Sequence, residues 1–375
     1  MITVQRYQDN TFQEDAVSHG TKVRMPLHTI ILPALGIATY LFIGKVGFVP
    51  LALVVAAILL GNVMAAVYHA EVVALRLGEP FGTLVLALAV TVIEVGLIVM
   101  IMLSGEPSPR LMRDSVHAVV MLVLHGLAGL CIVVCAIRQR EVEFHVEGAN
   151  AYLGVLIPMA LLVLVVPNFV VSAPGPYYSR LQLIFVSTAC LILYGGVLFI
   201  QTGWHRDYFL PVADDGTLDH EPPGRVTALA SFALLLISLL VVVLLAKNIA
   251  PAVEASVRAA GAPVAIVGVI VAAITLLPES AAAIRAALRN RLQSSLNLAL
   301  GSGVASIGLT VPAVALVSQW IGQPLELGIS MSSSVLMVLG FMVAIVTYGT
   351  GRTTLLSGIV HLVLLATYVF TIFAP

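Results

Sequence analysis

Long apolar runs follow one another along the chain from residue 27 onward, and this feature restricts the fold more than any other. A helix of about 20 apolar residues crosses the hydrocarbon core of a bilayer. The chain is 60% hydrophobic and 10% charged, whereas an ordinary soluble domain has about 25% charged residues. The alternating pattern of a transmembrane β-barrel is absent. We therefore predict an all-α polytopic membrane protein with about eleven transmembrane helices, near residues 27–44, 46–68, 80–103, 112–137, 151–171, 181–202, 226–247, 263–284, 292–317, 329–348 and 353–373.

Basic residues in the polar breaks between these runs predict the orientation in the membrane. Cytoplasmic loops of membrane proteins carry an excess of Lys and Arg. When the N-terminus is placed in the cytoplasm, 12 of the 18 basic residues fall on the cytoplasmic side. We therefore expect residues 1–26 to form a cytoplasmic tail and the C-terminus to lie outside. Residues 203–225 contain several Asp and Glu side chains and form a cytoplasmic linker, which either senses cations or is a plain solvated loop.

The predicted helices divide into a first helix at residues 27–45 and two groups of five, at residues 46–202 and 226–375. Because five is an odd number, the second group enters the membrane in the opposite orientation, as in the inverted repeats of many transporters. A Gly-x-Pro sequence opens the second helix of each group, at 78–80 and at 261–263. We therefore predict one helix followed by two inverted five-helix repeats.

One carboxylate lies inside the second helix of each group, Glu94 in the first and Glu279 in the second. An ionisable side chain at membrane depth is costly and usually marks a path for ions or protons. At about 1.5 Å per residue, each carboxylate lies more than 20 Å from the start of its helix, and the two helices run in opposite directions. We therefore expect the two side chains to meet near the middle of the membrane.

These two acids can perform cation and proton exchange. Carboxylate oxygens bind hard cations such as Ca²⁺, and carboxyl groups removed from water also hold protons. If a proton and a cation exclude each other at the same oxygens, their fluxes are coupled. We predict that Glu94 and Glu279 are the metal ligands and the proton carriers. The alternative is that each is a buried Glu whose hydrogen bonds are satisfied by a neighbouring helix.

Other groups near the two acids are candidate supporting ligands. Pro278 has no N–H, so the carbonyl of Ile274 loses its usual helical donor and could bind an ion, unless Pro278 only kinks the helix. His125 could relay protons or pack as a neutral side chain. The hydroxyl and amide candidates, each of which could instead bond within its own helix or pack between helices, are Thr91, Ser115, Thr275, Ser295, Asn297, Ser302, Ser306 and Thr310.

Several short motifs resemble a known family, the bacterial calcium/cation–proton antiporters of the ChaA type. The first repeat of that family is similar to Arg76-Leu77-Gly78-Glu79-Pro80-Phe81-Gly82 and Val92-Ile93-Glu94-Val95. Its second repeat and C-terminal part are similar to Leu277-Pro278-Glu279-Ser280, Leu288-Arg289-Asn290-Arg291-Leu292-Gln293, Leu296-Asn297-Leu298-Ala299-Leu300-Gly301-Ser302 and Thr350-Gly351-Arg352-Thr353. The resemblance extends over residues 68–375. It implies Ca²⁺/H⁺ exchange across a bacterial inner membrane, with Na⁺ or K⁺ as further substrates and with Glu94 and Glu279 at the ion site.

The chain departs from the vacuolar exchangers of the same superfamily at both acids. Those proteins carry Gly-Asn-x-x-Glu in each repeat, but here the residues before the two acids are Val90-Thr91-Val92-Ile93 and Thr275-Leu276-Leu277-Pro278. Two neutral amide ligands are therefore missing. Their loss makes a monovalent or broad cation specificity more credible.

We accordingly predict a secondary antiporter that exports Ca²⁺ in exchange for H⁺ by alternating access. The first alternative is a Na⁺(K⁺)/H⁺ antiporter with little Ca²⁺ activity. A remote alternative is an intramembrane enzyme that uses the carboxylate pair as acid and base. We expect no cofactor beyond the transported ions, and the net charge of −1 argues against a nucleic-acid partner.

Overall fold

The computed structural model describes residues 25–43, 49–78, 81–104, 109–209 and 222–374. The helices of the first half are α1 (Leu27–Ile43), α2 (Val49–Leu77), α3 (Phe81–Ser104), α4 (Leu111–Met121), the π-helical turn η1 (Leu122–Leu127), α5 (Ala128–Ala136), α6 (Val146–Leu164), the short turn η2 (Val166–Asn168), α7 (Arg180–Phe199) and the turns η3 (Ile200–Trp204) and η4 (Arg206–Phe209). Those of the second half are α8 (Arg225–Ala259), α9 (Ala265–Thr275), α10 (Leu277–Leu288), α11 (Leu292–Ile321), α12 (Met331–Tyr348) and α13 (Leu355–Phe373).

The predicted all-α membrane architecture is confirmed. Among the described residues, nine helices or continuous helical segments are long and apolar enough to cross a membrane. The pair α9 and α10 makes a tenth if its two parts, which meet at a 57° bend, form one span. Helix α1 has 17 residues and is shorter than these. The number of eleven spans therefore stays a prediction.

Two helices are longer than the sequence pattern predicted. We placed the ends of the second and seventh runs at 68 and 247, before polar residues, but α2 continues to Leu77 and α8 to Ala259. A helix the length of α8 spans about 52 Å at about 1.5 Å per residue, so it extends past a hydrocarbon core of about 30 Å into the polar zone. Each helix is followed by a glycine of positive φ, +69° at Gly78 and +66° at Gly261, a left-handed conformation that glycine adopts readily and that commonly ends helices.

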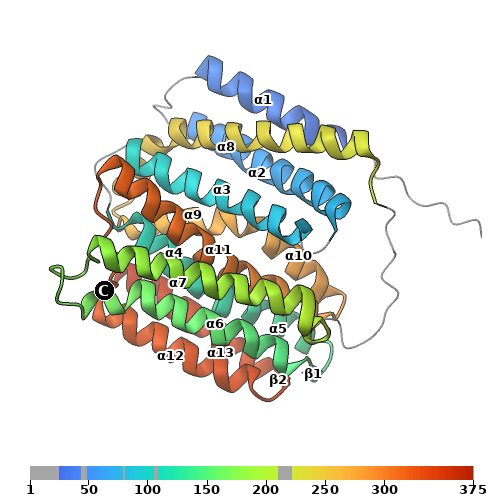
Figure 1. The fold of residues 1–375 in the computed structure, drawn as a ribbon, viewed down its shortest axis with the longest axis vertical. Coiled ribbons are helices and arrows are strands. Elements are labelled where there is room, and N and C mark those ends of the chain that lie inside the picture. The colour runs from blue at the N-terminus through green and yellow to red at the C-terminus, as the bar shows by residue number, and fades with distance from the viewer. Residues whose placement is uncertain (1–24, 44–48, 79–80, 105–108, 210–221, 375) are drawn as a thin grey trace, which may run out of the picture.

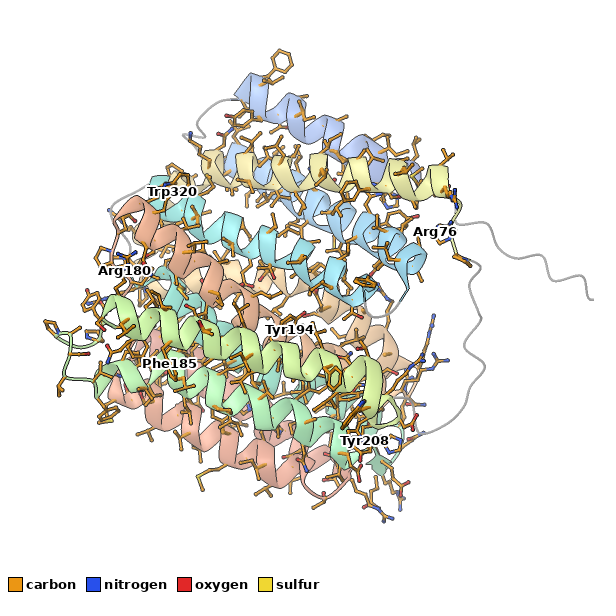
Figure 2. The ribbon with its side chains drawn as sticks, in the orientation of Figure 1. Arg76, Arg180, Phe185, Tyr194, Tyr208 and Trp320 are labelled. Carbon is orange, nitrogen blue, oxygen red and sulfur yellow. The ribbon has the colours of Figure 1, made fainter. Side chains whose placement is uncertain are left out.

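The helices lie side by side along one common direction (Figure 1). Helix α1 packs on α2 and α8, which contact each other along their length, and these three form one edge of the molecule. Helices α6, α12 and α13 lie toward the opposite edge, with α3, α4, α9 and α11 between the two (Figure 1). Arg76 and Tyr208 lie at one end of the bundle, and Arg180 and Trp320 lie at the other (Figure 2).

The two halves interlock through their second and third helices. Helix α3 of the first half packs on α11 of the second, and the broken pair α9–α10 of the second half packs on α4 and α5 of the first. The α4–α9 contact is close because Gly268 lacks a side chain. A Cβ atom there would lie 2.7 Å from the carbonyl carbon of Asp114. This crossing brings the second helices of both halves into the centre of the molecule.

A small two-stranded sheet connects the loop between α5 and α6 with the loop between α12 and α13. Strand β1 (Glu141–Glu143) pairs antiparallel with β2 (Arg352–Thr354), with Val142 opposite Thr353. Residues 1–24 of the predicted tail and residues 210–221 of the predicted linker, 203–225, lie outside the described residues. The described ends of that linker contain η4 and the start of α8.

Candidate functional site

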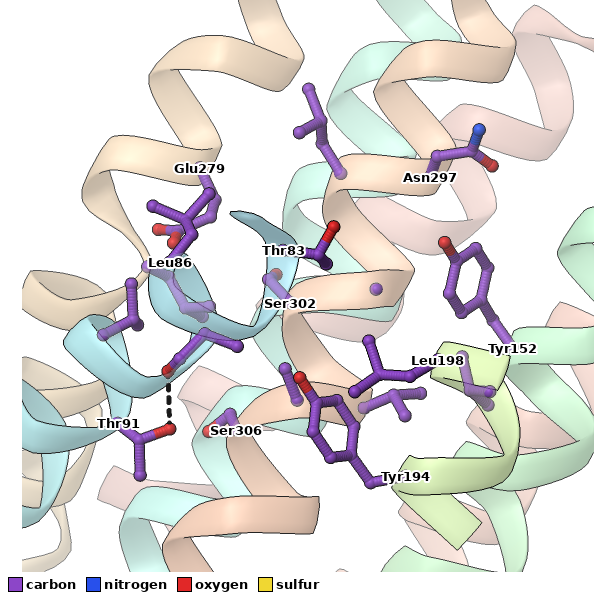
Figure 3. Close-up of a pocket in the computed structure, with 18 of the residues that line it drawn as sticks. Thr83, Leu86, Thr91, Tyr152, Tyr194, Leu198, Glu279, Asn297, Ser302 and Ser306 are labelled. Carbon is purple, nitrogen blue, oxygen red and sulfur yellow. Dashed lines mark hydrogen bonds between the residues drawn. The ribbon is translucent and has the colours of Figure 1, made fainter. Parts of the chain in front are cut away.

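The two predicted acids line one cavity in the centre of the molecule. The cavity has a volume of about 160 Å³ and is lined by α3, α6, α7 and α11 and by the bend between α9 and α10. Glu94 enters it from α3 and Glu279 from α10. The wall combines aliphatic side chains with about as many side chains that carry hydroxyl, amide or carboxyl groups (Figure 3). The crossing of the halves therefore brings together two carboxylates that are far apart in the sequence.

Glu94 is held by hydroxyl groups of the opposite half. Its side chain is buried, with 1% of the residue exposed. The Ser306 hydroxyl lies 2.8 Å from Oε1 and 2.7 Å from Oε2, and the Thr310 hydroxyl donates to Oε2 at 2.8 Å. Ser306 and Thr310 are four residues apart and therefore share one face of α11. Such bonds satisfy a carboxylate where water is scarce.

Glu279 sits at the break between α9 and α10. Pro278 cannot donate a backbone hydrogen bond, so α9 ends at Thr275 and α10 starts at Leu277. Glu279 is the third residue of α10, where the helix dipole favours negative charge. Its Oε2 atom is buried and has no hydrogen-bond partner in the described part of the chain. Glu94 on α3 and Glu71 on α2 both lie close enough to act on it electrostatically.

Five of the predicted supporting residues line the same cavity. They are Thr91, Thr275, Asn297, Ser302 and Ser306. Three hydroxyls donate to carbonyls of their own helices: Thr91 to Ala87 at 2.8 Å (Figure 3), Thr275 to Ala272 at 3.1 Å, and Ser302 to Ala299 at 2.8 Å. These three hydroxyls therefore bond within their own helices, which is one of the alternatives given for this set. Their oxygen lone pairs stay available to a ligand.

The other six predicted supporting residues lie outside the cavity lining. Of these, Thr310 donates to Glu94, and Ser295 donates to the carbonyl of Ala283 at 2.9 Å. Ile274 and Pro278 belong to the bend but do not face the cavity, and Ser115 packs where α4 meets α9. His125 lies in η1, where its Nδ1 is 2.8 Å from Nδ1 of His361 on α13. His361 in turn contacts the Thr347 hydroxyl at 3.1 Å. The structure therefore leaves as predictions the roles of Ile274, Pro278, Ser115 and His125.

Sequence reasoning missed several residues of the site. Tyr152 and Tyr194 line the cavity from α6 and α7, where each reads as one more apolar position in a run (Figure 3). A Tyr inside an apolar run is a weak signal, because its hydroxyl needs a partner when buried. Glu71 falls in the break that the apolar pattern predicts between residues 68 and 80, but it lies in α2. Its carboxylate lies within electrostatic reach of both Glu279 and Arg285.

The arrangement offers a cation two carboxylates and several neutral oxygens between apolar walls. No group of three or more His, Cys, Asp or Glu side chains that could hold a metal ion occurs within the described ranges. The oxygens suit a hard cation such as Na⁺, K⁺ or Ca²⁺. The same carboxylates can instead take up protons, so the cavity can hold either kind of ion.

Comparison with known proteins places this architecture among ion exchangers. The sodium/calcium exchanger protein family matches residues 48–203 and 230–374. The chain is 44% identical to the putative ionic transporter y4hA of Sinorhizobium fredii over 87% of this chain and 88% of that protein. It is 33% identical to the sodium-potassium/proton antiporter ChaA of Escherichia coli over 95% of this chain and 98% of that protein. The solved structure of the H⁺/Ca²⁺ exchanger CAX has the same fold, with a TM-score of 0.70 at 14% identity over 92% of this chain and 87% of that one.

Proposed function

The chain belongs to the sodium/calcium exchanger protein family, and from this premise we propose that it is a secondary cation/proton antiporter of a bacterial inner membrane. The observation that carries the proposal is the cavity lined by Glu94 of one half and Glu279 of the other. A cation that enters this cavity competes with protons for the same oxygens. The carboxylates therefore hold a proton or a cation but not both at once. This mutual exclusion is the condition for coupled exchange.

Alternating access follows from an inverted repeat. The family matches the chain in two blocks, 48–203 and 230–374, which nearly coincide with the predicted repeats at 46–202 and 226–375. The cavity extends from the acids toward Thr83 near the start of α3, Gln201 near the end of α7 and Asn297 near the start of α11. In the predicted topology, with the N-terminus in the cytoplasm and the C-terminus outside, these positions lie on the cytoplasmic side. The described state would then load its cation from the cytoplasm.

Ca²⁺ is the cation that the carboxylate pair favours on charge, because two ionised acids neutralise a divalent ion. A second candidate is exchange of Na⁺ or K⁺ for H⁺. Two observations favour it. Thr91 and Leu276 occupy the positions of the amide ligands in the vacuolar exchangers, so those two amide ligands are missing here. The chain is also similar to a sodium-potassium/proton antiporter. An intramembrane enzyme is a remote third candidate, for which the cavity offers no further support.

The test is exchange in everted membrane vesicles, followed with a pH-sensitive dye after addition of CaCl₂, NaCl or KCl. Wild-type protein should dissipate the pH gradient when its cation is added. Glu94→Gln and Glu279→Gln should each abolish this response at unchanged protein level, since the amide carries no charge for the cation. Glu141→Gln, which changes an exposed acid of β1, is the matched control and should exchange normally. Full exchange by either cavity variant would remove that acid from the mechanism.

A further inference from the structure

Two tyrosines line the central cavity together with the two acids. Tyr152 on α6 and Tyr194 on α7 are buried, with 1% and 6% of the residue exposed. In Figure 3 both rings enter from the side of α6 and α7, whereas Glu279 lies on the opposite side. Two phenol hydroxyls therefore share one cavity with the two carboxylates.

Neither of these hydroxyls has a hydrogen-bond partner in the described part of the chain. Tyr178, in contrast, lies outside the cavity and donates its hydroxyl hydrogen to the carbonyl of Leu162. A buried hydroxyl without a partner is costly, and a phenylalanine would fill the same space without that cost. The contents of the cavity must therefore supply the partner of each phenol.

Tyr194 packs at the depth of Glu94. Its ring lies against α11 where Gly308 has no side chain, and a Cβ atom at Gly308 would lie 2.7 Å from Cβ of Tyr194. In α11, Gly308 lies between Ser306 and Thr310, the two residues whose hydroxyls contact Glu94. Tyr194 and Glu94 therefore pack against α11 at the same level of the bundle.

Tyr152 packs nearer the mouth of the cavity. Its hydroxyl lies beside Gly301, where a Cβ atom would be 3.3 Å away. Gly301 precedes Gly308 by seven residues, which is about 10 Å along α11 toward its start. The Tyr152 hydroxyl therefore lies on the side from which water enters, and Tyr194 is the tyrosine that lies deeper, beside the acids.

A cation at the two acids needs more oxygens than the acids supply. Ca²⁺ takes about six to eight oxygen ligands, and two carboxylates provide fewer than that. The amides of the vacuolar exchangers are replaced here by Thr91 and Leu276. A phenol oxygen has lone pairs and adds a ligand without adding charge.

We propose that Tyr194 is a further ligand of the transported cation and that its phenol oxygen takes the place of a missing amide. The proposal rests on the proposed antiport function and adds a residue to its ion site. The ring, packed between α7 and Gly308 of α11, holds the oxygen toward a cation that is bound by Glu94 and Glu279. A proton needs no such ligand, since it bonds to a carboxylate alone. Tyr194 therefore strengthens cation binding and leaves proton binding unchanged.

Tyr194→Phe tests the proposal, because it removes the phenol oxygen and keeps the ring. Full-length protein is purified in detergent, and its melting temperature is followed as CaCl₂, NaCl or KCl is added. A cation that binds the folded protein raises this temperature at concentrations near its Kd. Loss of one neutral ligand should shift this response to about five- to tenfold higher concentration. In vesicles the half-maximal cation concentration should rise by the same factor, while the pH profile at saturating cation should keep its midpoint.

Tyr348→Phe is the matched control. The Tyr348 hydroxyl is also buried without a partner among the described residues, but this ring stacks on His361 outside the cavity lining. The control should bind cations and exchange them like the wild type. Cation binding by Tyr194→Phe that equals that of the wild type, or an equal loss in both variants, would overturn the assignment.

A second measurement needs no variant. A cation bound to a phenol oxygen changes the near-ultraviolet absorption of tyrosine, so the wild type should give a tyrosine difference spectrum when its cation is added. Absence of this spectrum at a cation concentration that stabilises the protein would overturn the assignment, even if Tyr194→Phe did not fold. Absence of exchange in wild-type vesicles, with cation binding intact, would instead refute the proposed antiport function.

Discussion

Replacing Ser306 with alanine removes the hydroxyl that contacts both oxygens of Glu94. Its oxygen lies 2.7 and 2.8 Å from the two carboxylate oxygens, and only Thr310 would then still donate. A hydrogen bond to a charged group contributes about 1.5–3 kcal/mol. At about 1.4 kcal/mol per tenfold change in affinity, the cation concentration for half-maximal exchange should rise about 10- to 100-fold.

The assay is the vesicle exchange measurement with a titration of the cation at fixed pH. Ser256→Ala on α8 is the matched control, because its hydroxyl donates only to Ala252 of its own helix at 2.7 Å. This control should leave the half-maximal concentration unchanged. If Ser306→Ala behaves like Ser256→Ala, the hydroxyl face of α11 does not position Glu94 and the reasoning fails.

Two further predictions concern stability, measured as thermal unfolding of the protein in detergent. Glu326→Gln should destabilise the protein by about 3 kcal/mol, because it breaks a largely buried ion pair with Arg113. The guanidinium of Arg113 lies 2.7 Å from the Glu326 carboxylate. An unchanged melting temperature would contradict this prediction. Gly340→Ala should cost about 1–3 kcal/mol, since the added Cβ would overlap Nε2 of His125. Gly154→Ala, where a Cβ meets nothing within 4 Å, is its control, and equal melting temperatures for these two variants would refute the packing argument.

The parts of the fold that depend on local sequence could be predicted. Apolar runs gave the helices, and the spacing of Glu94 and Glu279 from the starts of their helices indicated that the two would meet. Pro278 marked the position of the break between α9 and α10. The ends of α2 and α8 could not be placed, because a helix that leaves the lipid continues through polar residues until a glycine stops it.

The parts of the site that depend on contacts between the halves could only be found in three dimensions. Ser306 was one of several equal candidates in the sequence, and only the packing of α11 on α3 distinguishes it from Ser302. The pairing of His125 with His361 joins helices that are far apart in the chain. Tyr152 likewise reaches the cavity because of how α6 packs on α11, where Gly301 makes room for its ring.

The central claim is that protons and cations compete for carboxylates in one cavity, and proton release on cation binding tests it most directly. Purified protein in weakly buffered detergent solution is titrated with Ca²⁺, Na⁺ or K⁺ while the released protons are counted. The wild type should release protons on binding its cation, and Glu279→Gln should release fewer. Cation binding by Glu279→Gln with the proton release of the wild type would contradict the account.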